Sequence, residues 1–387
     1  MASNLGKAFS NILLQRLISF RQLSDPDTDN QLGFCQGAQT SDHIFTLTTC
    51  IEKYVTKGRK RIYSCFVDYA KAFDSVCREA LLYKLWKMGV QGQFFDCIQH
   101  MYTNSSAKVK LLNKLSDKID IICGTEQGHP MSPELFKCFI HQLSLDLNSI
   151  DDINVPHLNS NRITHLLCAD DLVLLALDGH SLQAMLDVLL TYCIDWGLTV
   201  NVNKTAVLVF NAGGRLLKES HTFKLGENSI PSARDYCYLG ITFSLSGTTK
   251  DAQRKLRQKG LRSYFSLKRM IDIRHIRKSI LFKLFDALLR PIAAYASQVW
   301  LPSTGLFKLF TQPRGNKEKA KIIASDPLEN YHLSFLKWTM GVNKTTSNAA
   351  VWGDCGRYPL GVELSKQVFN YRKRLEEMED DDSSCLV

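Results

Sequence analysis

Residues 164–176 read THLLCADDLVLLA, a stretch in which Asp170 and Asp171 interrupt an otherwise apolar run. The apolar residues on either side predict the two strands of a hairpin, with the acids at its turn. Burying both charges without partners would cost several kcal/mol. A protein cation, protonation, exposure at the hairpin tip or a bound metal ion could compensate them. Because Asp also favours ordinary turns, this stretch alone does not choose between these interpretations.

A second acid, Asp68, directly follows the apolar strand predicted at residues 62–67. Acids at the ends of neighbouring strands can converge on Mg²⁺, which prefers oxygen ligands. Two such ions about 4 Å apart can activate a hydroxyl and stabilise the leaving oxygen of a phosphoryl transfer. Asp68, Asp170 and Asp171 are therefore the candidate catalytic and metal-binding residues. We interpret Asp74 as the N-cap of a helix that ends at Met88, with Gly89 as its C-cap, and a catalytic role for Asp74 is the alternative.

The remaining pattern mixes helices and strands. The spacing of apolar residues predicts helices over residues 5–20, 40–54, 74–88, 94–101, 181–196 and 333–340, and another that starts near residue 133. Further strands are predicted over residues 108–112, 118–123, 198–202 and 206–210, with a strand pair over 236–243. Because these elements do not alternate as β-α-β units, the sequence predicts an α+β fold.

The charge of the chain is concentrated in one segment. The 387 residues include 48 Lys and Arg against 38 Asp and Glu, a net charge of +10, and 45% are hydrophobic, which argues against disorder. Residues 250–283 contain twelve basic and two acidic residues, so they account for the whole excess. Such an excess indicates an anionic partner, although a solvated helix surface is the alternative. Basic residues recur there at three-, four- and seven-residue intervals: Lys255, Lys259, Arg262 and Arg269.

Cysteine usage and hydropathy bear on the compartment. The twelve cysteines include no Cys-x-x-Cys pair and lie mostly in apolar runs, which predicts buried free thiols in a reducing compartment and no zinc site. We see no signal segment at the N-terminus and no uncharged apolar stretch of membrane-spanning length. We therefore expect a nuclear or cytoplasmic protein without a membrane partner.

Five segments together resemble the motifs of reverse transcriptases from LINE-type, non-LTR retrotransposons. In chain order they are residues 66–76 (FVDYAKAFDSV), 127–136 (QGHPMSPELF), 169–171 (ADD), 197–205 (GLTVNVNKT) and 238–240 (YLG). Five motifs in this order are a specific signal, whereas ADD alone is a weak one. The resemblance extends from residues 3–7 (SNLGK) to 356–360 (GRYPL), and residues 33–37 (GFCQG) with Thr40 and Asp42 resemble a template-side motif.

The resemblance implies a right-hand polymerase fold. Residues 1–245 would form partial fingers and a palm with an antiparallel sheet, residues 246–302 a basic helical thumb, and residues 303–387 a helical C-terminal region with an acidic tail. The implied activity is an RNA-directed DNA polymerase that transfers nucleotides to a DNA primer 3'-hydroxyl with two Mg²⁺ ions, or Mn²⁺ in their place. The implied partners are an RNA template, a DNA primer and deoxynucleoside triphosphates, and the oligomeric state is not indicated.

The resemblance also assigns roles to individual residues. Asp68 and Asp170 would bind the two metal ions, with Asp171 beside them as a ligand or an electrostatic partner. Phe73 would press against the sugar and exclude a 2'-hydroxyl, although its position also suits a core aromatic residue. The basic residues of 250–283 would lie in the thumb and contact phosphates without reading sequence.

Three further elements are assigned in the same way. Gln127 and Gly128 would lie against the incoming nucleotide and the template, where glycine permits close backbone approach. Lys204 would approach the triphosphate as a charge partner or proton donor, although by itself it suits a surface turn. The hairpin that holds the primer end would contain Tyr238, Leu239 and Gly240.

The sequence also departs from the family pattern. Cys168 stands where the residue before ADD is usually aromatic. Upstream strands that grip the triphosphate, an endonuclease region and a Cys/His knuckle are not recognisable, so we expect a chain truncated at both ends. A catalytically inactive relic that still binds nucleic acid nonspecifically is the alternative function. A nucleotide cyclase is disfavoured because it needs neither a template motif nor a thumb.

Overall fold

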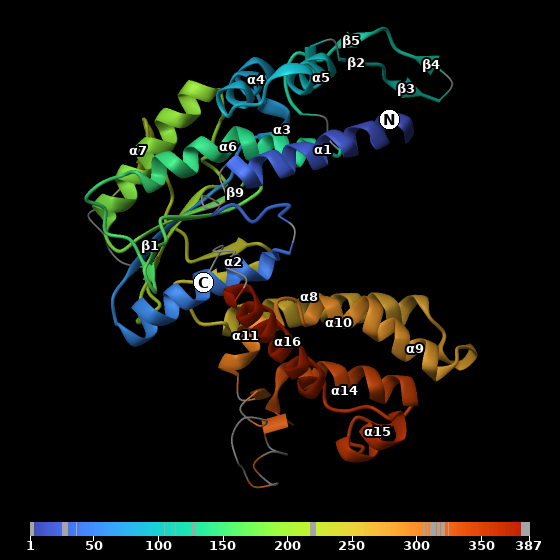
Figure 1. Ribbon diagram of the computed structural model, residues 1–387. Coiled ribbons are helices and arrows are strands. Elements are labelled where there is room, and N and C mark those ends of the chain that lie inside the picture. The colour runs from blue at the N-terminus through green and yellow to red at the C-terminus, as the bar shows by residue number, and fades with distance from the viewer. Residues whose placement is uncertain are drawn as a thin grey trace. The chain divides into compact units, whose positions relative to one another are not determined.

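A four-stranded antiparallel sheet contains both acid-bearing strands in the computed structural model (Figure 1). Its strand order is β10–β1–β9–β8, with bounds Ala206–Phe210, Ile62–Val67, Asp171–Ala176 and His165–Cys168. All six residues of β1 are buried, which explains why this strand reads as a nearly continuous apolar run. The strands predicted at residues 62–67 and 206–210 and the hairpin at 164–176 are confirmed.

The structure describes residues 4–24, 30–35, 37–103, 105–112, 114–125, 128–216, 222–304 and 325–380, together with residues 306, 307, 309, 315, 318, 322 and 323. Compactness divides the chain into two units, one ending at Tyr236 and the other beginning at Cys237. The three-part division predicted at residues 245 and 302 stays a prediction.

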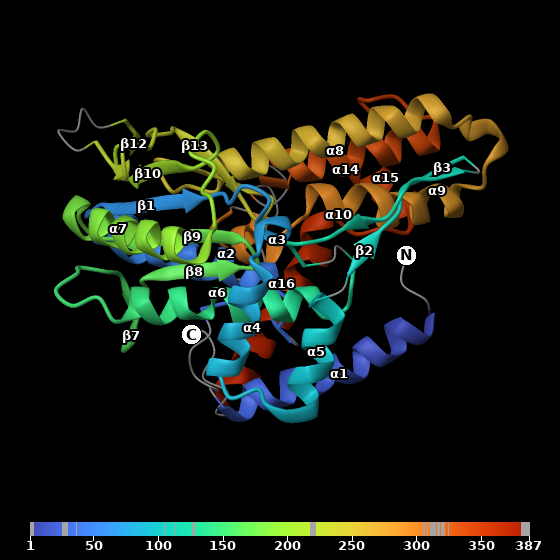
Figure 2. The same ribbon diagram turned by 90° about the horizontal axis from the view of Figure 1, so that it is seen from above.

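Helices cover both faces of the sheet in the first unit. Helices α6 (Ser132–Asn148) and α7 (Gly179–Trp196) pack on one face, and α2 (Thr40–Ile51) lies on the other (Figures 1 and 2). Asp178 caps α7 by accepting a hydrogen bond from Ser181 N at 2.8 Å, and Gly197 ends it with φ 73°. Alternate residues of β1, including Cys65 and Val67, share a hydrophobic core with α6 and α7. The catalytic candidates therefore project from a rigid, doubly covered sheet.

The other elements of the first unit surround this sheet. They are α1 (Asn4–Ser24), the π-helical turn η1 (Glu52–Lys57), α3 (Ala72–Ser75), α4 (Arg78–Lys87), α5 (Gly92–Thr103) and the short strands β2 (Ser106–Ala107), β3 (Lys110–Leu111), β4 (Lys114–Leu115), β5 (Ile119–Asp120), β6 (His157–Leu158), β7 (Asn161–Arg162), β11 (Lys224–Leu225) and β12 (Asn228–Ser229). Strands β2 to β5 form an arm in two paired segments, which replaces the two longer strands predicted at 108–112 and 118–123.

Two predicted elements differ from the structure. The helix predicted from Asp74 is broken into α3 and α4, and Asp74 lies inside α3, so its assignment as the N-cap is wrong. The break arises because Gly124 N and Thr125 N donate to the carbonyls of Val76 and Phe73, at 2.8 and 2.9 Å. The strand predicted over residues 198–202 is irregular and makes a single bridge, between Val200 and Tyr69.

The second unit is mostly helical. Strand β13 (Asp235–Tyr238) crosses the unit boundary and pairs with β14 (Ile241–Ser244). The helical elements that follow are α8 (Lys250–Met270), η2 (Ile273–His275), α9 (Lys278–Leu284), η3 (Phe285–Leu289), α10 (Arg290–Ala293), α11 (Ser297–Trp300), η4 (Leu301–Ser303), α14 (Pro327–Met340), α15 (Asn348–Cys355) and α16 (Leu360–Asp380). Gly260 allows α8 to lie close to α10 and α14. A Cβ added at this position would lie 3.1 Å from Ala293 Cβ and 3.2 Å from the Tyr331 ring, so a side chain there would crowd both helices.

The burial of the cysteines and the apolar character of the helices bear on two of the sequence predictions. The eleven cysteines in the described ranges are free; four are buried, but Cys77, Cys123 and Cys237 are exposed, so the expectation of mostly buried thiols is only partly right. Within the part of the chain that the structure describes, no helix has the length and apolar character needed to cross a membrane.

Candidate active site

The register of the sheet brings the predicted acids to one edge. Val67, the last residue of β1, lies opposite Leu172 of β9, so Asp68 and Asp171 leave this strand pair at the same end. Strands β8 and β9 are joined through the pair Cys168–Asp171, which leaves Ala169 and Asp170 as a two-residue turn. Two sequence motifs about 100 residues apart thus meet because β1 and β9 are neighbours.

The electrostatics of this edge reflect the concentration of negative charge. Although Asp171 is exposed by its accessible area, atoms around its carboxylate remove part of its hydration. This desolvation, with the negative charges of Asp170 and then Asp68, raises the pKa of Asp171 to about 6. Burial, followed by the negative charges of Asp171 and Asp170, raises the pKa of Cys168 to about 11, so this thiol stays protonated at neutral pH. A bound cation would relieve the repulsion among the three carboxylates.

The loop between α7 and β10 contacts both the backbone and the side chain of Asp68. Lys204 Nζ lies 3.8 Å from Asp68 Oδ2, with the lysine side chain 69% exposed. Asp68 N donates to Thr205 Oγ1 at 3.2 Å, and Asp68 O accepts from Asn201 N at 2.7 Å. Residues 201–205 thus fix the backbone of Asp68. The ammonium of Lys204 stays exposed to solvent, where a charged ligand could reach it.

The donor set suits a hard divalent cation. Asp68, Asp170 and Asp171 supply carboxylate oxygens at one edge, and neutral Cys168 does not compete as a thiolate. In the described ranges, however, no group of three or more His, Cys, Asp or Glu side chains is already gathered at metal-binding distances. The three carboxylates are therefore close enough to affect one another's charge and are of the right type for an oxygen-ligated ion. Their side chains are not already arranged around a metal position.

Phe73 lies close to this edge along the chain. It sits in α3, five residues after Asp68, and its ring stacks on Phe136 at a centroid distance of 4.5 Å. The side chain is half-buried, so one part packs against the core and the rest remains accessible. Its carbonyl accepts hydrogen bonds from Thr125 N and Oγ1, at 2.9 and 3.3 Å, which joins the first motif to the segment that leads into the second.

The second motif is partly described. Gln127 lies outside the described residues. Gly128 is exposed with φ 80°, a conformation that favours glycine, and an added Cβ would meet nothing within 4 Å. The glycine is therefore required by its backbone conformation rather than by a close approach within this chain.

The predicted primer-holding residues belong to the β13–β14 hairpin. Tyr238 is buried, and the turn consists of Leu239 and Gly240 with φ 45° and 80°. Two positive φ values in a two-residue turn are the pattern of a type I′ hairpin. Tyr295 Oη donates to Leu239 O at 3.0 Å, so the turn is fixed within the second unit.

Helix α8 buries one side and exposes most of its basic residues. The buried side follows Ala252, Leu256, Gly260 and Tyr264 at four-residue intervals. Lys259, Arg262 and Arg269 are exposed, and Lys255 is half-buried. Three of the four predicted basic residues are therefore exposed to solvent, and Lys255 lies at the border of the buried side.

One contributor to this edge, Gln31, has no recognisable signal in the sequence. Gln31 is buried and hydrogen-bonds to both backbone polar atoms of Ala169, in the turn that carries Asp170. Its position two residues before the template-side motif points to this region, but a buried glutamine has no distinctive pattern in sequence. Thr205, in contrast, was part of the fourth motif without an assigned role.

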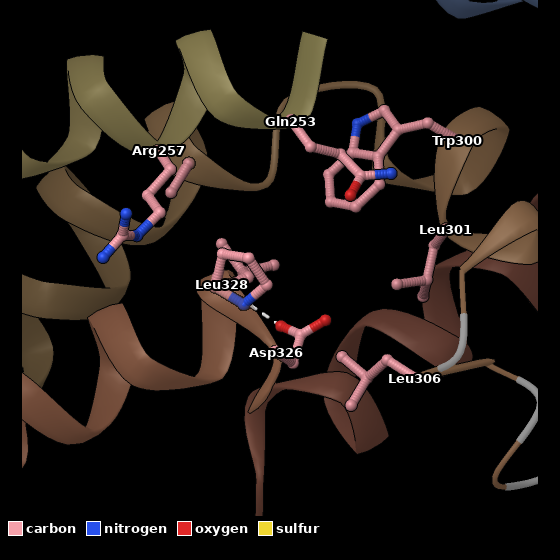
Figure 3. Close-up of a pocket in the computed structure, with 9 residues that line it drawn as sticks. Gln253, Arg257, Trp300, Leu301, Leu306, Asp326 and Leu328 are labelled. Atoms are coloured by element: carbon pink, nitrogen blue, oxygen red, sulfur yellow. Dashed lines mark hydrogen bonds between the residues drawn. The ribbon is translucent and has the colours of Figure 1, made fainter. Parts of the chain in front are cut away.

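A small pocket in the second unit stands apart from the predicted residues. It is lined by residues that include Arg257, Trp300, Asp326 and Leu328 (Figure 3). The Asp326 carboxylate caps α14 by accepting from Leu328 N at 2.9 Å and Glu329 N at 3.0 Å. Because this acid is already used by the helix and none of the predicted site residues lines the pocket, we assign the chemistry to the sheet edge.

The sequence family of the chain is clear. A family described as reverse transcriptase (RNA-dependent DNA polymerase) matches residues 1–243, more than half of the chain. The chain therefore belongs to the reverse transcriptase family. This membership confirms the predicted α+β right-hand polymerase class, and the family generally uses divalent metal ions.

The curated relatives are retrotransposon proteins, as the motifs predicted. The chain is 28% identical over 225 residues to the Pol polyprotein of the retrotransposable element R2DM of Drosophila melanogaster, which covers 56% of this chain and 21% of the relative. It is 22% identical over 251 residues to the RNA-directed DNA polymerase of the mobile element jockey of Drosophila funebris. This match covers 63% of this chain and 26% of that relative. A probable RNA-directed DNA polymerase from transposon BS of Drosophila melanogaster is 24% identical over 315 residues. This match covers 78% of this chain and 33% of that relative. The chain thus spans about a fifth to a third of these relatives.

Solved structures show a more distant likeness. Apo telomerase from Candida tropicalis aligns with a TM-score of 0.45 and 12% identity, covering 86% of this chain and 53% of telomerase. The family assignment rests on the sequence match and the motifs, to which this likeness adds no argument.

Proposed function

We propose that the chain is an RNA-directed DNA polymerase of a non-LTR retrotransposon, which extends a DNA primer along an RNA template. The observation that carries this proposal is the meeting of Asp68 with Asp170 and Asp171 at one sheet edge, from two separate motifs. Deoxynucleoside triphosphates are the proposed substrates, and Mg²⁺ the proposed ion, with Mn²⁺ as a substitute.

The chemistry follows from the residues at this edge. Asp68 and Asp170 would hold two divalent ions, with Asp171 as a third ligand or an electrostatic partner. The ions would activate the primer 3'-hydroxyl and stabilise the charge on the leaving pyrophosphate. Lys204 would add a positive charge near the triphosphate, since its ammonium already lies beside Asp68 and is exposed.

Selection of the nucleotide is assigned to neighbouring residues. Phe73 would meet the sugar with the accessible part of its ring and exclude a 2'-hydroxyl, while Phe136 supports the ring from behind. Gln127 and Gly128 would lie against the incoming nucleotide and the template. The stacking of Phe73 on Phe136 supports this role, because a ring that excludes a hydroxyl must itself be held in place.

Binding of the template and primer is assigned to the second unit. The exposed basic residues of α8 would contact phosphates without reading sequence. The turn of Tyr238, Leu239 and Gly240 would hold the primer end, a role that its fixed type I′ geometry suits.

Primer extension tests this function. Purified chain, Mg²⁺, deoxynucleotides and a DNA primer annealed to an RNA template should give extended primer. Asp170→Ala should abolish extension, whereas Asp195→Ala, an exposed acid on α7, should leave it unchanged as the matched control. A wild-type chain that binds the primer–template in a mobility-shift assay without extending it would contradict the proposal and favour the inactive relic.

A further inference from the structure

The turn that carries Asp170 is bracketed by one buried side chain from a distant part of the chain. Gln31 is 2% exposed, and its Nε2 donates to Ala169 O at 3.0 Å. Ala169 N donates to Gln31 Oε1 at 2.8 Å, and Gly33 N donates to the same oxygen at 2.8 Å. One amide group therefore satisfies both backbone polar atoms of Ala169.

Ala169 needs such support because of its backbone conformation. Its φ of 59° lies in the left-handed region, which is unfavourable for a residue with a Cβ. A conformation of this kind persists where the surrounding structure holds it. Since Ala169 is the first residue of the two-residue turn, its conformation sets the direction in which Asp170 leaves the strand.

The backbone around Gln31 strengthens this contact. Leu167 N donates to Asn30 O, and Leu32 N donates to Leu167 O, both at 2.9 Å, so residues 30–32 run parallel to β8. Gly33 then passes so close to the turn that an added Cβ would lie 2.2 Å from Ala169 N. Residues 30–33 therefore pack directly against the Ala169–Asp170 turn, and the absence of a side chain at Gly33 makes this close approach possible.

We propose that Gln31 is a positioning residue: its side-chain amide holds the Ala169–Asp170 turn and so sets the placement of the metal-binding carboxylates Asp170 and Asp171. Gln31 does not itself touch the substrate. This inference rests on the proposed function for its catalytic meaning, whereas the bracing of the turn can be tested separately. Partners that orient metal ligands commonly change metal affinity about 10- to 100-fold when they are removed.

The first experiment compares Gln31→Met with a matched control. Methionine has a similar length but neither the donor nor the acceptor. Gln183 on α7 makes the same pattern of bonds elsewhere, with Nε2 donating to Lys224 O at 2.9 Å and Oε1 accepting from Lys224 N at 3.0 Å. In hydrogen–deuterium exchange, Gln31→Met should speed exchange of peptides covering Ala169 and Gly33 about tenfold. Gln183→Met should change only the peptide that covers Lys224.

The second experiment measures the consequence for the carboxylates. Binding of Mn²⁺ to the purified chain, followed by the electron paramagnetic resonance signal of the free ion, should weaken about tenfold in Gln31→Met and not in Gln183→Met. In primer extension, Gln31→Met should lower kcat and leave KM for the deoxynucleotide nearly unchanged, since the braced turn holds ligands and does not bind the nucleotide. The double variant Gln31→Met with Ala169→Gly should regain part of the Mn²⁺ affinity, because glycine adopts the same φ without strain.

The outcomes separate the two proposals. Unchanged exchange at Ala169, or Mn²⁺ affinity equal to that of Gln183→Met, would overturn the positioning role. If Gln31→Met does not fold, Gly33→Ala serves as the second variant, because its methyl group must push the segment off the turn and should give the same losses. A wild-type chain that does not extend primers would sink the proposed function, while exchange and Mn²⁺ binding would still decide the role of Gln31.

Discussion

Lys204 illustrates how one exposed side chain can matter for chemistry and little for stability. Its ammonium lies 3.8 Å from Asp68, but 69% of the side chain is exposed, so the pair adds little to folding. We expect Lys204→Met to change the free energy of unfolding by less than about 0.5 kcal/mol. Because a charge-assisted bond to phosphate is commonly worth about 1.5 to 3 kcal/mol, incorporation of a single deoxynucleotide should slow about 10- to 100-fold.

Single-turnover incorporation with Lys204→Met measures this effect. Lys224→Met, an exposed lysine on β11, removes the same charge elsewhere and should incorporate at the wild-type rate. Equal rates for the two variants would show that Lys204 is an ordinary surface lysine.

Two buried histidines, His43 on α2 and His165 on strand β8, predict the response to acid. Burial lowers the pKa of His43, helped by the nearby His165, and burial lowers that of His165, each from 6.5 to about 3. The unfolded chain therefore binds more protons than the folded chain between pH 6.5 and 3, so stability is complete above this window and falls as the pH drops through it. Between pH 7 and pH 5 the free energy of unfolding should fall by about 2 kcal/mol per histidine.

Urea unfolding of the chain at pH 7 and pH 5 checks this prediction. His165→Gln should remove about 2 kcal/mol of the loss between pH 7 and pH 5, and His275→Gln, an exposed residue, should leave it intact. A wild-type chain equally stable at both pH values would contradict the burial of neutral histidines.

At the residue scale, the sequence was informative where the signal is local. Asp170 and Asp171 interrupt an apolar run, and such charges require an explanation wherever they occur. Gln31 was not predictable in the same way, because its partner Ala169 is 138 residues away and a glutamine in sequence does not indicate burial. The left-handed φ of Ala169 is likewise set by contacts that the hairpin pattern does not contain.

At the element scale, a buried carboxylate joins three helices of the second unit. Glu329 on α14 is fully buried; its Oε1 accepts from Trp352 Nε1 of α15 at 3.2 Å, and its Oε2 accepts from Leu360 N, the first residue of α16, at 2.5 Å. His332 Nδ1 lies 3.1 Å from Oε1. Glu329→Ala leaves these donors buried without an acceptor and should lower the free energy of unfolding by about 3 kcal/mol or more.

Chemical unfolding and limited proteolysis of the α15–α16 region measure this loss. Glu376→Ala, in an exposed pair with Arg372 on α16, is the control and should cost less than about 0.5 kcal/mol. If Glu329→Ala were as stable as the control, Glu329 would not be what joins these helices.

Element boundaries were less predictable than element types. The apolar spacing correctly predicted the helix over residues 181–196, which the structure has as α7, but its N-cap at Asp178 was not predicted. The break between α3 and α4 was missed because it depends on hydrogen bonds from Gly124 and Thr125, about 50 residues away. The predicted strand at 198–202 failed for a related reason, since that segment is used to hold the backbone of Asp68 rather than to extend the sheet.

At the scale of the whole molecule, the net charge of +10 gains a location on the chain. The basic segment 250–283 corresponds to α8, η2, α9 and the connections between them, and the exposed residues of α8 lie away from its apolar side. We expect the triple substitution Lys259→Ala, Arg262→Ala and Arg269→Ala to weaken binding of an RNA–DNA duplex. Each lost phosphate contact should reduce the dependence of log affinity on log salt by about 0.9.

A salt titration of duplex binding by fluorescence anisotropy measures both quantities. The triple substitution Lys366→Ala, Arg372→Ala and Lys373→Ala removes the same charge from α16, where Arg372 and Lys373 are paired with Glu376 and Glu377. If the two triple variants bound the duplex alike, the net charge alone, and not the surface of α8, would account for binding.

In the proposed function, Asp68 and Asp170, from two separate motifs, act as one metal-binding unit for nucleotidyl transfer. Single-turnover extension of a DNA primer on an RNA template with Asp68→Asn, Asp170→Asn and the double variant tests this. Residues that act as a unit are not additive, so each single substitution should slow extension by about 1,000-fold or more and the double variant should be no slower than the singles. Near-wild-type extension by either single variant, or losses that multiply in the double variant, would contradict the claim.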